Sequence, residues 1–219
     1  MRRKKLLAVD PSLTCSGWAL FDLATRRLLG VGKIRSLSSA SALPHRLADM
    51  QLKISRVFDE LGLDAGDVLV CEAPTTMRDP RAAFVVEQVR GIFETLARAR
   101  ALVVPGRLNP RSVQYEMLGL KGKQLLRETV KLTAAAAVSR LYAQSLRRLG
   151  FDCGIDNLSR NQDIVDAMLV GGLALTRIKS AEAAGVSLEE YFDGNALRRR
   201  AGARRLQKRA AAAARTSRL

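Results

Sequence analysis

Two short apolar runs in this chain each end on a carboxylate that stands close before a proline. The first run ends at Asp10, which precedes Pro11, and the second, residues 68–71, leads into Glu72 two residues before Pro74. Short apolar runs of this kind are typical of strands buried inside a sheet. Ligands of open α/β sheets bind at the carboxyl ends of the strands, so the pattern predicts two acids at one sheet edge. A plain turn at Asp-Pro is the alternative for Asp10.

The rest of the chain predicts an α/β fold. Residues 5–10, 17–23 and 28–35 have the pattern of an antiparallel meander, and helical spacing covers residues 43–61 and 81–100. A strand at 102–104 after the second helix implies a parallel pair with a right-handed crossover. Further helices are expected at 110–118, 124–149 and 162–178, with a polar linker at 150–159. The expected sheet is mixed, with three antiparallel strands first and parallel strands after them, flanked by helices.

The length of 219 residues and an apolar content of 47% allow one well-packed body with an appendage. We place the folded domain at residues 1–180 and a basic C-terminal extension at 181–219, either flexible or helical when bound to a partner.

A net charge of +16 and a pI near 10.8 make nucleic acid the first partner to consider. Residues 195–219 contain nine Lys or Arg and no acid. The rest of the chain, residues 1–194, therefore has a net charge of +7. We therefore expect DNA contacts from the tail, chiefly from Arg198, Arg199, Arg200, Arg204 and Arg205. An unknown protein partner for the tail is the alternative.

The cysteines and the apolar segments predict a cytoplasmic protein that does not enter the membrane. Three widely spaced cysteines form neither a disulfide framework nor a zinc pattern. The basic start resembles a signal peptide, but Asp10 and Pro11 end the apolar stretch too early, and no later run approaches the roughly 20 residues of a membrane helix.

Asp163 and Asp166 stand three residues apart at the start of a predicted helix, so both can point the same way. An acid in a first helical turn can also serve as a cap, which explains one of them but not two. If both meet Asp10 and Glu72, four carboxylates would repel one another unless cations were present. Oxygen ligands suit Mg²⁺ or Mn²⁺, and two such ions can hydrolyse a phosphodiester.

Two other features have simpler interpretations than catalysis. His45, the sole histidine, lies near the start of an amphipathic helix and is expected at the surface. The Gly171-Gly172 pair could indicate an actin-like kinase, but it lies inside an apolar helical pattern, where close packing explains it.

Four motifs in order resemble the RuvC-type Holliday junction resolvases, a branch of the RNase H-like nucleases. They are LAVDPSLTCSGWAL, VCEAP, EQVRGIFETLARARALVVPGRLNPRSV and NQDIVDAMLVGGLAL, which together span most of residues 6–175. Each motif alone is weak, but the four in this order are specific.

The resemblance implies an RNase H-like fold and a homodimer that cuts opposing strands of a four-way DNA junction. It makes Asp10, Glu72, Asp163 and Asp166 the catalytic carboxylates. It implies that together they bind two Mg²⁺ or Mn²⁺ ions in each active site. It also implies that Lys121 or Lys123 lies near the scissile strand, Lys123 being the catalytic candidate, with Arg111 as a further DNA contact. An ordinary basic loop is the alternative for both lysines.

The chain departs from the family pattern after Glu72. The family often has an aromatic residue there that opens the junction, whereas here the first aromatic is Phe84. Junction selectivity is thus less firmly implied than nuclease chemistry. The alternatives are a related nuclease acting on RNA, forks, flaps or within a transposase, an actin-like kinase, and an inactive DNA-binding module.

Overall fold

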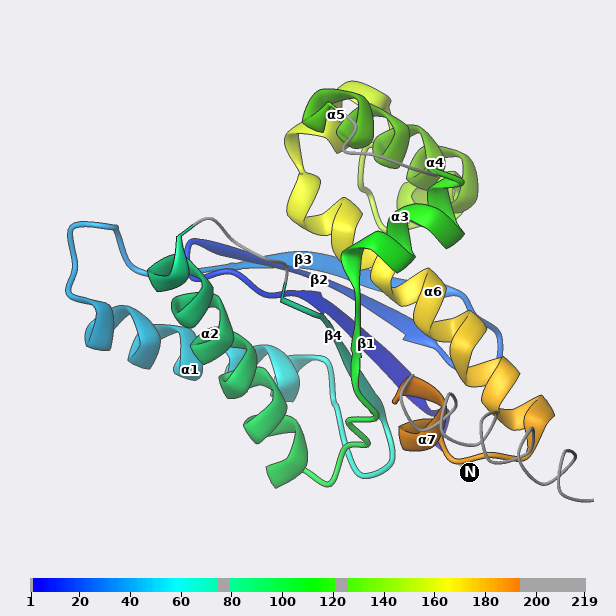
Figure 1. Ribbon diagram of the computed structural model, residues 1–219, viewed down its shortest axis with the longest axis horizontal. Coiled ribbons are helices and arrows are strands. Elements are labelled where there is room, and N and C mark those ends of the chain that lie inside the picture. The colour runs from blue at the N-terminus through cyan, green and yellow to red at the C-terminus, as the bar shows by residue number, and fades with distance from the viewer. Residues whose placement is uncertain (1, 75–78, 121–125, 194–219) are drawn as a thin grey trace, which may run out of the picture.

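A mixed five-stranded sheet lies between two layers of helices in the computed structural model, which describes residues 2–74, 79–120 and 126–193 (Figure 1). The strand order is β3-β2-β1-β4-β5. The strands are β1 (Lys5–Asp10), β2 (Cys15–Asp22), β3 (Leu28–Arg35), β4 (Val68–Glu72) and β5 (Arg107–Leu108). The first three pair antiparallel, while β4 runs parallel to β1 and β5 parallel to β4. The predicted α/β class and mixed sheet are confirmed.

The fifth strand differs from the predicted one. At residues 102–104 only Val103 forms a bridge to β4, and the strand proper is β5, Arg107–Leu108. The register against β4 shifts by one residue between these two contacts. Pro105 has no N–H to donate, and Gly106 adopts a φ of 152°, so the backbone leaves the sheet and returns.

The helices confirm most of the predicted elements and correct two of them. They are α1 (Leu43–Glu60), α2 (Pro80–Ala99), α3 (Pro110–Leu118), α4 (Arg127–Arg148), α5 (Ile155–Arg160), α6 (Gln162–Ala184) and α7 (Leu188–Phe192). The expected polar linker at 150–159 is wrong, because α5 forms there around the fully buried Leu158. Helix α6 also continues beyond the predicted end at residue 178.

The predicted domain boundary at residue 180 falls inside α6. Ala181 is buried, and Leu188 and Phe192 of α7 pack against the core. The division into a nuclease domain and a basic extension stays a prediction, because residues 194–219 lie outside the described part. Within the described ranges, no helix has the length and apolar character required to cross a membrane.

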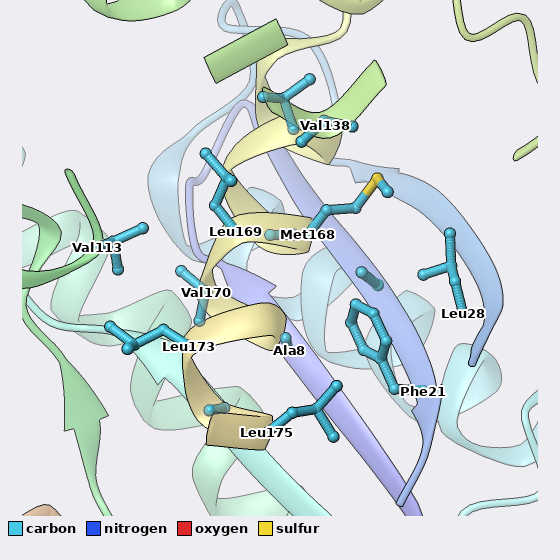
Figure 2. Packing of buried hydrophobic residues seen from close by; sticks show 14 of the residues in the cluster. Ala8, Phe21, Leu28, Val113, Val138, Met168, Leu169, Val170, Leu173 and Leu175 are labelled. Atoms are coloured by element: carbon cyan, nitrogen blue, oxygen red, sulfur yellow. The ribbon is translucent and has the colours of Figure 1, made fainter. Parts of the chain in front are cut away.

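Each face of the sheet has its own core. Leu6 and Ala8 of β1 face α6 in one core, whereas Leu7 and Val9 face α1 and α2 in the other. Figure 2 shows the first core, in which Ala8 and Phe21 lie against α6. Since strand side chains alternate between faces, Asp10 lies on the α6 face, and the same alternation along β4 puts Glu72 there.

Helix α6 approaches the sheet so closely that glycine is needed where they meet. A Cβ on Gly17 would lie 1.9 Å from the backbone oxygen of Asp163, and one on Gly171 would lie 2.2 Å from the ring of Phe21. Gly17 pairs with Asp10 in the sheet, so this contact brings the start of α6 beside the end of β1. The contact at Gly171 supports the packing interpretation of the Gly171-Gly172 pair.

We predict that Gly17→Ala lowers the free energy of unfolding by about 1–3 kcal/mol, since the new methyl group must displace α6 or the sheet. Urea denaturation measures the loss. Gly91→Ala in α2 is the matched control, because a Cβ there meets no atom within 4 Å. That change should leave stability equal or slightly higher. Equal stabilities of Gly17→Ala and wild type would contradict the close approach.

Candidate active site

All four predicted carboxylates line one cavity of about 500 Å³. Asp10 and Glu72 are the last residues of two adjacent parallel strands, and Asp163 and Asp166 lie in the first turns of α6. The structure thus brings together the residues that the sequence patterns selected from three separate segments. Their catalytic role stays a prediction.

Capping does not explain the two acids of α6. The N-cap residue of this helix is Asn161, and no side chain caps its N-terminus with a hydrogen bond. Asp166 instead accepts a hydrogen bond from Gln162 Nε2 at 2.8 Å. Both residues line the cavity.

A row of three residues crosses the sheet beneath the start of α6. Asp10 pairs with Gly17, and Gly17 pairs with Lys33. Because Gly17 has no side chain, the backbone of Asp163 fits between Asp10 and Lys33. The carboxylate of Asp163 then forms an ion pair with the largely buried Lys33, with 3.2 Å between Nζ and Oδ2.

Burial and mutual repulsion raise the pKa of three of the carboxyls. Burial is the larger cause for Asp10, whose pKa lies well above its usual range, and Glu72, Asp166 and Asp163 add repulsion. The same two causes raise the pKa of Glu72 to about 7, with the repulsion coming from Asp166. Burial, reinforced by Asp163, raises the pKa of Asp166 to about 6. A positive charge bound in this cavity would relieve that repulsion.

Basic side chains occupy the same cavity as the acids. Its lining includes Arg90 of α2, Arg127 and Lys131 of α4, and Arg160 of α5. Lys131 and Arg127 lower the pKa of Asp166, which partly offsets the effect of burial. The cavity therefore combines acceptors suited to cations with donors suited to phosphate.

The side chains in the cavity offer the kind of ligand atoms that a hydrated divalent cation binds. Four carboxylates supply only oxygen ligands, which hard cations prefer. Ser159 Oγ and Gln162 Oε1 line the cavity, are buried, and have no hydrogen-bond partner among the described residues. In the described part of the chain, however, no group of three or more His, Cys, Asp or Glu side chains is arranged to hold a metal ion. Asp163, for one, is turned to Lys33.

The other predicted contacts are only partly within the described residues. Arg111 is exposed on α3 and is not among the residues that line the cavity. Lys121, Lys123 and the tail residues Arg198, Arg199, Arg200, Arg204 and Arg205 lie outside the described part. His45 is exposed on α1, as expected. All three cysteines are free, in agreement with the absence of a predicted disulfide framework.

Sequence reasoning missed Lys33, Arg90, Arg127 and Lys131. A weak signal existed for the last two, because their spacing of four residues puts them on one face of α4. Lys33 is a charge inside the mostly apolar strand β3, which ends on a second charge at Arg35, and this position inside the strand could have marked it. No sequence signal placed Arg90 at the cavity.

Comparisons with known proteins agree with this fold, although no family model matches the chain. The chain is 29% identical over 171 residues to the crossover junction endodeoxyribonuclease RuvC of Parvibaculum lavamentivorans, covering 76% of this chain and 94% of that protein. It is 27% identical over 130 residues to the RuvC of Cereibacter sphaeroides, covering 58% and 75%. The fold is similar to that of T. thermophilus RuvC in complex with Holliday junction substrate, with a TM-score of 0.56, 16% identity, and coverage of 82% and 96%.

The sheet, its helical layers and the similarity to T. thermophilus RuvC give the chain an RNase H-like fold. Within that fold class, the resemblance to the RuvC-type Holliday junction resolvases that the four motifs indicated is confirmed by the similarity in sequence and in fold.

We predict that Asp10→Asn stabilises the protein in metal-free buffer by about 1–2 kcal/mol above pH 7, because it removes one buried charge from a repelling cluster. An acid whose pKa is raised by folding makes the folded state bind more protons than the unfolded one. Stability is therefore lost as the pH rises from the unfolded pKa of about 4 through the folded values, which reach about 7 for Glu72.

Thermal unfolding of the variant and the wild type in chelator between pH 4 and pH 8 measures this effect, and the difference should grow with pH across that window. Asp49→Asn is the matched control, because Asp49 pairs with Lys53 on α1, away from the cavity. A difference independent of pH would contradict the repulsion.

Proposed function

We propose that this chain is a structure-selective, metal-dependent DNA endonuclease that resolves four-way junctions by paired symmetric nicks. The observation that carries the proposal is the cavity in which four carboxylates from β1, β4 and α6 meet basic side chains from α2, α4 and α5. The names of the RuvC relatives support the same activity.

In this proposal Asp10, Glu72, Asp163 and Asp166 hold Mg²⁺ or Mn²⁺, with two ions in each site. Bound there, such ions would supply an activated water and would stabilise the leaving oxygen of the phosphodiester. One oxygen of the Asp163 carboxylate pairs with Lys33 in this structure, so Lys33 would lie beside the bound ions. The cut leaves a 5′-phosphate and a 3′-hydroxyl.

The basic residues of the cavity orient the substrate in this scheme. Arg127 and Lys131 lie one helical turn apart on α4 and can contact successive oxygens of the scissile strand. Lys123 and Lys121 precede this helix in the chain, so they remain candidates for the contact at the reacting phosphate. We place Arg111 and the basic tail on DNA farther from the cut.

We further propose a homodimer as the active form, because a four-way junction presents two equivalent strands and each site cuts one of them. A C2 dimer would match the symmetry of the junction. Analytical ultracentrifugation of the full chain with and without junction DNA tests the assembly.

Cleavage of matched substrates tests the activity. The wild-type chain with Mg²⁺ should cut a synthetic four-way junction at symmetric positions and leave linear duplex, fork, flap and RNA–DNA hybrid largely intact. Preferential cleavage of a fork, flap or hybrid would keep the nuclease and reject the resolvase. An absence of cleavage on every substrate would reject both and favour an inactive DNA-binding module.

Asp10→Asn should lower the cleavage rate by at least about 100-fold, because the charge that binds the cation is lost. Junction binding, measured by fluorescence anisotropy in Ca²⁺ or chelator, should stay within about twofold, since the contacts to phosphate are unchanged. Asp49→Asn, remote from the cavity, should cut as the wild type does. A fully active Asp10→Asn protein would remove Asp10 from the mechanism.

Deletion of residues 195–219 should weaken junction binding and flatten its dependence on salt. Each lost phosphate contact lowers the slope of log K against log salt by about 0.9, and the segment contains nine basic residues. Titrations between about 50 and 200 mM salt measure the slope. An unchanged slope would mean that the tail does not touch DNA.

A further inference from the structure

One arginine is buried at the base of the candidate site and bonded to the backbone of a predicted catalytic residue. Arg90 of α2 is 2% exposed and lines the cavity. Its Nε donates a hydrogen bond of 2.7 Å to the carbonyl oxygen of Glu72, the last residue of β4. Its Nη1 also bonds to Glu87, one turn earlier on the same helix. The guanidinium thus ties α2 to the strand end that presents Glu72.

A second arginine extends this contact into a cluster. Arg107 of β5 pairs with Glu87 at 3.0 Å and with the buried Glu94 at 2.7 Å. The cluster therefore holds together α2, the end of β4 and the start of β5. Glu87 accepts from both arginines, so its carboxylate fixes the plane in which the Arg90 guanidinium lies.

Burying these charges costs free energy. A contribution to stability therefore does not by itself explain why the chain has this cluster. Apolar residues of similar volume often stabilise a fold as much as a buried ion pair or more. A planar guanidinium, in contrast, can direct two donors at fixed angles, one to the backbone and one to a carboxylate. The cluster lies beneath the strand end that carries Glu72, where such direction has an effect on chemistry.

We propose that Arg90 is a positioning residue that fixes the backbone of Glu72, and so the direction of its carboxylate into the cavity. This inference rests on the proposed function, since it assigns Arg90 a part in the same reaction.

A direct contact of Arg90 with DNA is the competing explanation. Two of its nitrogens already have protein partners, and its side chain is almost wholly covered. Arg127, Lys131 and Arg160, which line the same cavity and are more exposed than Arg90, are better placed to contact substrate.

The test compares three variants with one control variant, and the stability of each is measured. Arg90→Met removes the charge and both hydrogen bonds. Arg90→Lys keeps the charge but loses the planar guanidinium group. Arg107→Met disrupts the same cluster without removing the bond to Glu72. Arg98→Met is the exposed control on α2, since Arg98 pairs only loosely with Glu94 at 3.5 Å. Urea denaturation of each variant gives the stability against which its activity is judged.

We expect Arg90→Met to lower kcat on the junction about 10–100-fold with KM changed less than about twofold, and Arg90→Lys to recover part of that loss. Arg107→Met and Arg98→Met should cut at close to the wild-type rate. A raised KM with unchanged kcat for Arg90→Met would overturn the proposal in favour of a DNA contact. A rate loss in Arg107→Met as large as in Arg90→Met would reduce Arg90 to a stabilising role.

A second readout does not depend on cleavage. In a Mn²⁺ titration followed by thermal unfolding, Arg90→Met should bind the ion about 10–100-fold more weakly than the wild type, because a misdirected Glu72 is a poorer ligand. If the wild type cuts no substrate, the proposed function fails, and this titration alone decides the role of Arg90. Equal affinities of variant and wild type would then overturn the positioning role.

Discussion

The contact between β2 and the first turn of α6 is the constraint on which the candidate site depends. At Gly17 the helix backbone rests directly on the sheet, with no side chain between them. This distance lets the carboxylates of α6 reach the acids at the ends of β1 and β4. The large core on the same face, in which α6 packs on β1 and β2, holds the helix in that position.

Electrostatic repulsion among the acids of the site opposes folding. Three acids have raised pKa values because they are buried together, so the folded chain holds a repulsion that an unfolded chain does not have. Lys33 offsets part of it at Asp163, and Arg90 offsets part of it at Glu72. Repulsion of this kind is typical of functional sites, where binding rather than folding benefits from the arrangement.

Sequence reasoning was most successful where a single pattern fixes both an element and the place of its side chain. Asp10 and Glu72 could be predicted because a short apolar run has one carboxyl end, and Asp163 and Asp166 because helical spacing aligns them. The antiparallel direction of the first three strands and the parallel direction of the later ones followed from the same runs.

Features that depend on packing between distant segments could not be predicted. The approach of Lys33 to Asp163 follows from the register of β2 against β3. This register cannot be deduced from a local sequence pattern. Arg90 reaches Glu72 only because α2 packs under β4. Helix α5 forms because Leu158 finds a buried place, although its segment is polar. The break in strand pairing at Pro105 and Gly106 was not predicted, and where the chain pairs again depends on β4.

The lining of the cavity has a consequence for the order in which ligands arrive. Its four acids face four basic side chains, so their formal charges cancel. A polyanion would therefore meet no net repulsion from the residues that line the site. If the chain acts as proposed, DNA and cation can bind in either sequence, and DNA that binds first stays uncut until the cation arrives.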